Sequence, residues 1–86
     1  MIIKKELIKR DIAGDTILVP VGKTVYDDNG LFVLNEVGAF LWDRLPQANG
    51  PEDLTEAVLQ EYEVTAGEAR RDIEEFLDKL RRMEII

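Results

Sequence analysis

The sequence predicts an α+β domain in which a three-stranded antiparallel sheet is followed by three helices. Two observations carry this prediction. Short runs rich in apolar and β-branched residues, separated by glycine-containing turns, fill the first third of the chain. Apolar residues at helical spacing, preceded by capping residues, fill the remainder. With 86 residues the chain is long enough for one modest core, so we expect a single domain over residues 1–86.

The sheet is predicted from three extended runs. The first two are Leu7–Ile12 and Thr16–Val19. Gly14-Asp15 between them is interpreted as a two-residue hairpin turn, because glycine tolerates positive φ. Asn29-Gly30 is a strong turn signal that leads into the third strand, Leu31–Leu34.

The helices are predicted from their caps and from their apolar spacing. Asn35 is a good N-cap for the first helix, which Pro46 stops. The capping boxes Asp53-x-x-Glu56 and Thr65-x-x-Glu68 open the second helix and the third, longest helix. Their apolar faces are Val37, Phe40, Leu41 and Leu45; then Leu54, Ala57, Val58 and Tyr62; then Ala69, Ile73, Phe76, Leu77, Leu80 and Met83. Trp42 lies off the first stripe and is interpreted as packed rather than as an exposed contact residue. Strands before helices, with short connections, indicate a winged-helix-like topology.

The residue types that are missing argue against catalysis. The chain has no histidine, no cysteine and no serine, which removes the usual nucleophiles, imidazole bases and zinc ligands. Its glycines are scattered and form no phosphate-binding loop. Asp27-Asp28 is interpreted as part of a turn, since it lacks the spacing of a calcium loop. We therefore predict that the chain is not an enzyme, that it needs no cofactor and that it has no metal site.

Charge and hydropathy narrow the classes of partner. The formal net charge is −7 and the pI is near 4.5, whereas nucleic-acid-binding proteins usually show a basic footprint. The basic residues of the last helix are interleaved with carboxylates, which dilutes any positive face. No apolar run approaches the roughly 20 residues of a membrane span, and the start does not resemble a signal peptide. We predict a cytoplasmic protein that binds neither nucleic acid nor membrane.

The run Leu31-Phe32-Val33-Leu34 is apolar at every position, although a strand with one wet face should alternate. Its second face and its outer edge need a cover. Either the N-terminal hairpin or the apolar tail Ile85-Ile86 supplies it, or the edge stays open for a guest strand. The residues alone leave both answers open.

Four stretches in order carry a resemblance to a known family: "IAGDTILVPVG", "LFVLNEVGAFLWDRL", "DLTEAVLQEY" and "RRDIEEFLDKLRRMEII". Together they resemble the PqqD-like family, the recognition elements of ribosomal peptide natural-product pathways, over nearly the whole chain. The resemblance implies a winged-helix-like domain without catalysis. It implies binding of the leader segment of a ribosomally synthesised precursor peptide, and its presentation to a modifying enzyme such as a radical enzyme, a peptidase or a cyclase.

The resemblance also implies where the leader docks. It is added as an antiparallel strand to the third strand, and it lies in the cleft between that strand and the third helix. Carried onto this chain, the strand comprises Leu31, Phe32, Val33 and Leu34. Helical spacing adds Phe76, Lys79 and Met83 as side chains that line the cleft, with Lys79 or a nearby arginine meeting an acidic leader residue.

The sequence departs from the family pattern in two places. Residues 23–30 form a longer segment than in the most compact members, and Met83-Glu84 stands where the family often has glycine. Two other functions are alternatives to leader binding. The first is an acidic winged-helix transcriptional regulator. The second is a structural subunit that dimerises through the strand edge, whereas leader binding predicts a monomer or weak dimer.

Overall fold

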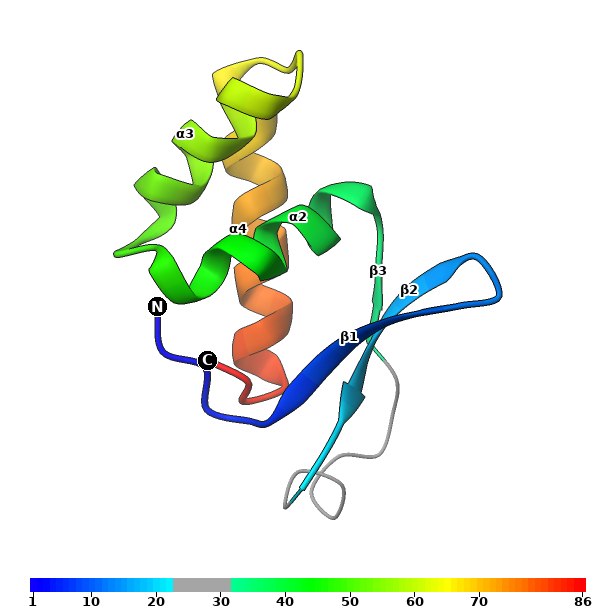
Figure 1. Cartoon of the computed structure of the whole chain (residues 1–86). Helices are drawn as coiled ribbons and strands as arrows, with labels where there is room; N and C mark the ends of the chain where they lie inside the picture. Colours follow the sequence, from blue (N-terminus) through cyan, green and yellow to red (C-terminus); the bar gives the residue numbers. More distant parts are fainter. Residues whose placement is uncertain (23–31) are drawn as a thin grey trace.

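The computed structural model describes residues 1–22 and 32–86. It contains β1 (Leu7–Ile12), β2 (Asp15–Pro20), β3 (Phe32–Leu34), α2 (Glu36–Arg44), the short 3-10 helix η1 (Leu45–Gln47), α3 (Pro51–Glu61) and α4 (Ala66–Arg82). The strands form one antiparallel sheet in the order β1-β2-β3. In the part of the chain described, the α-helices all follow the sheet, which confirms the predicted fold class (Figure 1). The predicted Asp27-Asp28 and Asn29-Gly30 turns, and Leu31, lie outside the described residues.

The hairpin turn consists of Ala13-Gly14, so the predicted turn at Gly14-Asp15 was wrong by one residue. Ala13 and Gly14 have φ values of 52° and 87°, and Ile12 pairs with Asp15. Two successive positive φ values are those of a type I′ turn, whose twist matches the flanking strands. Alanine is an uncommon residue in this conformation. The register that turns Leu18 toward the helices therefore outweighs the local preference.

Two of the three predicted helix starts are confirmed by their caps. The Asn35 side chain accepts a hydrogen bond of 2.7 Å from the Gly38 N–H, and Thr65 accepts one of 3.1 Å from the Glu68 N–H. The start predicted at Asp53 was wrong, because α3 begins at Pro51. Proline suits the first turn, where its missing N–H has no partner to lose. The Asp53 carboxylate instead accepts from the Asn49 N–H at 2.8 Å.

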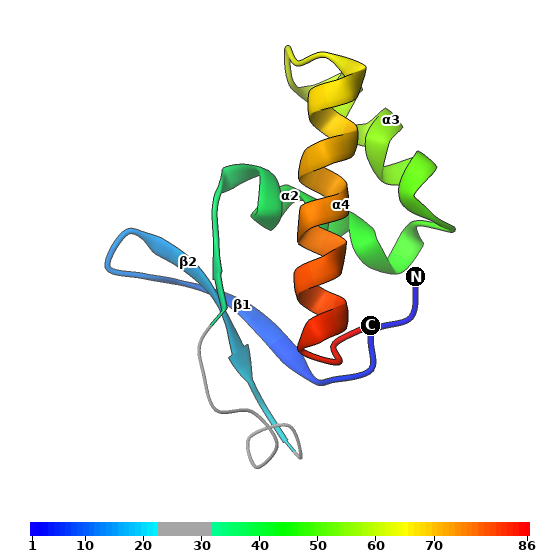
Figure 2. The same ribbon diagram turned by 180° about the vertical axis from the view of Figure 1, so that it is seen from behind.

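The core lies between the helices and the inner face of the sheet. Helix α4 packs beside α3, and α2 runs from the end of β3 toward α3, while the β1–β2 hairpin extends away from the helices (Figures 1 and 2). Trp42 is only 8% exposed, so it packs inside as predicted. Phe40 is half-buried and meets Tyr62 edge to face at 5.4 Å. The buried apolar cluster comprises Leu18, Leu34, Leu41, Trp42, Leu45, Ala48, Leu54, Val58, Ala69, Ile73, Phe76, Leu77, Leu80 and Ile85.

The C-terminal tail is held by the end of α4 and by the N-terminal segment. The Ile85 N–H donates to the Leu80 carbonyl at 2.8 Å, and the Glu84 N–H donates to the Arg81 carbonyl at 3.0 Å. This pair of bonds is a Schellman motif, in which Glu84 takes the left-handed position with φ of 58°. The Ile85 side chain is fully buried, and its carbonyl accepts from the Lys4 N–H at 2.6 Å. The two chain ends therefore lie close together (Figure 2).

Replacing Glu84 by glycine is expected to stabilise the domain. The left-handed conformation costs a residue with a Cβ roughly 1–2 kcal/mol, part of which is lost again through the greater freedom of unfolded glycine. We expect a net gain of about 0.5–1 kcal/mol, measured as a higher midpoint in urea unfolding. Glu74→Gly is the matched control, because Glu74 is exposed inside α4, where glycine costs about 0.5–1 kcal/mol. A Glu84→Gly variant that is less stable than the parent would contradict the assignment of the motif.

Candidate functional site

Strand β3 forms one edge of the sheet. Within residues 1–22 and 32–86 its only strand partner is β2, with Ile17 opposite Val33. The β1–β2 hairpin therefore covers only the inner edge of β3. The apolar tail does not cover the outer edge, because the backbone of Ile85 is bonded to Leu80 and Lys4. The sequence suggested two segments that could cover this edge, the N-terminal hairpin and the C-terminal tail. Neither of them lies on the outer edge of β3.

The hairpin register determines which backbone groups of β3 face that outer edge. In a two-residue hairpin the flanking residues, here Ile12 and Asp15, form a hydrogen-bonded pair. Hydrogen-bonded and non-bonded pairs alternate along antiparallel strands, so the even-numbered residues of β2 direct their N–H and C=O groups toward β3. Their partners are Phe32 and Leu34, which are therefore bonded to β2. The N–H and C=O of Val33 point the other way, to the outer edge.

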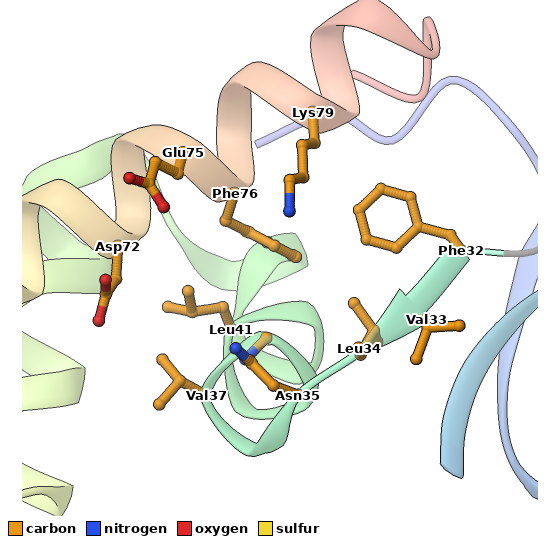
Figure 3. Close-up of a pocket in the computed structure, with 11 residues that line it drawn as sticks. Phe32, Val33, Leu34, Asn35, Val37, Leu41, Asp72, Glu75, Phe76 and Lys79 are labelled. Carbon is orange, nitrogen blue, oxygen red and sulfur yellow. The ribbon is translucent and has the colours of Figure 1, made fainter.

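The side chains of β3 divide between the two faces of the sheet. Leu34 is 5% exposed in the core and Phe32 is half-buried on the same face, toward the helices. Val33 is 62% exposed, and its side chain points away from Phe76 and Lys79 (Figure 3). The apolar residues of β3 thus have two different environments. Phe32 and Leu34 pack on the inner face, and Val33 is exposed on the other face.

A cleft lies along this edge, between β3, the start of α2 and one side of α4 (Figure 3). Its volume is about 140 Å³, smaller than the roughly 300–1,000 Å³ of pockets that enclose drug-sized ligands. It has room for a side chain or two and is too small for a large cofactor. Its lining is Phe32, Val33, Leu34, Asn35, Val37, Gly38, Leu41, Asp72, Glu75, Phe76 and Lys79.

Helix α4 presents one stripe of side chains to the cleft. Asp72, Glu75, Phe76 and Lys79 recur at intervals of three and four residues, which places them on one face of the helix. The Phe76 ring meets the Phe32 ring edge to face, with centroids 6.5 Å apart. Asp72, Glu75 and Lys79 are exposed and surround this aromatic pair. The cleft therefore combines an apolar floor, one charged wall on α4 and a strand edge without a strand partner in the part of the chain described.

Five of the seven site residues predicted from the sequence line this cleft. They are Phe32, Val33, Leu34, Phe76 and Lys79. Met83, the C-cap of α4, packs against the core and is not among the lining residues, and Leu31 lies outside the described residues. The sequence reasoning missed Asn35, Val37, Gly38, Leu41, Asp72 and Glu75. Asp72 and Glu75 could have been found from their spacing to Phe76 and Lys79.

Other chemistries have little support in the residues described. No group of acidic side chains there is arranged to hold a metal ion. None of the helices in residues 1–22 and 32–86 is both long and apolar enough to pass through a membrane. Burial raises the pKa of the Tyr62 hydroxyl above its usual value, and the Glu36 and Glu61 carboxylates raise it further, which disfavours the phenolate form.

The fold and the cleft define a winged-helix-like domain with a sheet edge that no strand of residues 1–22 and 32–86 covers. The family model described as coenzyme PQQ synthesis protein D (PqqD) matches residues 16–86, and the chain belongs to this family. A search of curated proteins finds no match.

Two solved structures share this fold. TbiB1 in complex with the TbiA(beta) leader peptide is 27% identical, with a TM-score of 0.73 over 99% of this chain and 93% of that one. Lasso peptide synthetase B1 complexed with the leader peptide is 24% identical, with a TM-score of 0.69 over 93% of this chain and 88% of that one. The second likeness concerns the fold alone.

Proposed function

We propose that this protein binds the leader segment of a ribosomally synthesised precursor peptide by strand addition to β3 and presents it to a modifying enzyme. The observation that carries the proposal is a strand edge, unpaired among the described residues, beside a cleft of side-chain size. Family membership and the likeness to TbiB1, which was solved with a leader peptide, support the same assignment. The whole chain acts as one domain in this proposal.

The leader is held in two ways. Its backbone pairs with the N–H and C=O of Val33, which determines the register. Alternate leader side chains point into the cleft, because successive residues of a strand face opposite sides. There they meet Phe32, Leu34 and Phe76, whose apolar surface contributes to affinity when it is covered.

The protein acts as an adaptor and not as a catalyst. The lining of the cleft offers carboxylates and one amine, with no thiol, hydroxyl or imidazole. The modifying enzyme, a radical enzyme, a peptidase or a cyclase, supplies the chemistry. Held as a strand, the leader directs the remainder of its precursor to that enzyme.

A titration tests this function directly. The probe is a synthetic leader segment taken from a short precursor gene, if one is found beside the gene for this chain, and a scrambled leader is the control. We expect the leader to bind saturably and one to one, and the scrambled leader not to bind. Duplex DNA is the second arm, and an acidic protein should bind it only weakly at physiological salt. Absence of leader binding, or a DNA complex tighter than about micromolar, would overturn the proposal.

The oligomeric state is measured alongside. We expect the free chain to be a monomer or a weak dimer, because the β3 edge is reserved for the leader. Light scattering across protein concentration checks this. A tight dimer that persists at saturating leader would favour a structural subunit in which β3 is paired between copies.

A further inference from the structure

The charges on the α4 wall of the cleft are arranged in order along its length. Asp72 and Glu75 lie near the end at which Asn35 and Val37 line the cleft, while Lys79 lies near Phe32 at the other end (Figure 3). Asp72 and Lys79 are seven residues apart, which corresponds to a rise of about 10 Å along the helix. One end of the cleft is therefore acidic and the other is basic.

These charges have no partner within the part of the chain described. Ion pairs there join Lys9 to Asp43 at 2.6 Å and Asp78 to Arg81 at 3.4 Å, and none involves Asp72, Glu75 or Lys79. All three side chains are exposed. A ligand in the cleft can pair with them without breaking an existing ion pair.

The direction of β3 converts this arrangement into an order along the guest. The strand runs from Phe32, at the Lys79 end, to Leu34, toward the Asp72 end (Figure 3). An antiparallel guest runs in the opposite direction, so its N-terminal part lies at the acidic end and its C-terminal part at the basic end. Guest residues that face the cleft are two apart, and a separation of four spans about 13 Å.

We propose that the cleft selects guest peptides by charge order: a basic residue, an apolar residue two positions later, and an acidic residue two positions after that. This inference rests on the proposed function and specifies its peptide class. The basic residue pairs with Asp72 and Glu75, the apolar residue contacts Phe32 and Phe76, and the acidic residue pairs with Lys79. Exposed pairs of this kind change Kd by up to about fivefold each and weaken with salt.

The test uses three peptides with blocked ends, so that terminal charges do not contribute. Their sequences are TKTLTET for the basic-first order, TETLTKT for the acidic-first order and TQTLTQT for the neutral control. Affinity is read from chemical-shift titrations of the labelled protein, which measure weak binding and locate it on β3. We expect the basic-first peptide to bind about tenfold more tightly than the acidic-first peptide, with the neutral peptide between them.

A charge-swapped variant is the matched control. Asp72→Lys combined with Lys79→Glu leaves the net charge of the chain unchanged and reverses the order along the cleft. The two substituted residues are exposed, so the variant should melt near the temperature of the parent. We expect it to prefer the acidic-first peptide.

Each remaining outcome overturns the charge-order inference. Equal affinity for the two orders, an acidic-first preference of the parent, or no binding of any of the three peptides would each do so. The proposed function is judged separately, on the natural leader. If that leader binds and shifts the β3 amides while charge order has no effect, strand addition stands and only the charge rule falls. If the leader leaves the β3 amides unchanged, the proposed function falls.

Discussion

Replacing Val33 by proline is expected to weaken leader binding at least tenfold while the domain stays folded. Proline removes the N–H that the alternation places on the outer edge of β3, and proline is tolerated on edge strands when that N–H faces outward. The ring also occupies the space that the guest backbone must approach. Binding is measured by titration with the leader, and folding by circular dichroism melting. Val33→Ala is the control, because it shortens the side chain and keeps the N–H.

Proline at the next position, Leu34, is expected to disrupt the fold itself and not only leader binding. Leu34→Pro removes an N–H that pairs with β2, together with a side chain that is 5% exposed in the core. Loss of the leucine side chain alone costs about 2–5 kcal/mol, which Leu34→Ala measures separately. We expect Leu34→Pro to unfold the domain. If Val33→Pro unfolds the domain while Leu34→Pro leaves it intact, the assignment of the outer edge to Val33 is reversed.

Truncating Phe76 to alanine is expected to lower the free energy of unfolding by about 3–5 kcal/mol. The ring is only 7% exposed, although it also lines the cleft and meets Phe32. Domains of this size have a total stability of about 5–15 kcal/mol, so the loss removes a large share of it. Urea unfolding measures the effect.

Phe76→Leu separates packing from binding. Leucine keeps much of the buried apolar volume, so we expect a folded domain that loses about 1–2 kcal/mol. The substitution removes the flat aromatic ring that a guest side chain would contact, so leader affinity should fall as well. A Phe76→Ala variant that loses less than about 1 kcal/mol would show that the ring is not part of the core.

The sequence predicted the elements well where one local signal decides the structure. Asn35 and Thr65 are confirmed as caps, because each side chain is the nearest acceptor for an otherwise unpaired helix N–H. The prediction failed where two signals competed. Asp53 fits a capping box, but Pro51 starts the helix earlier. The hairpin turn contains Ala13 because strand register outweighs the preference of a single residue.

The site was predictable only in part for a different reason. The stripe of Phe76 and Lys79 follows from helical spacing, and the open edge follows from the apolar run at β3. Asp72 and Glu75 look like an ordinary solvated face in the sequence, since nothing local shows that β3 and α2 lie opposite them. Their place in the cleft depends on the packing of segments about forty residues apart, which periodicity within one helix cannot reveal.

Amide hydrogen exchange at β3 tests the central claim most directly, namely that a guest strand pairs with its outer edge. In the free protein the Phe32 and Leu34 amides should exchange slowly, because they are bonded to β2, while the Val33 amide should exchange fast. Saturation with the leader should slow exchange at Val33 by at least tenfold and change its neighbours less. If Val33 exchanges at the same rate with saturating leader, no guest strand pairs with β3 and the account is contradicted.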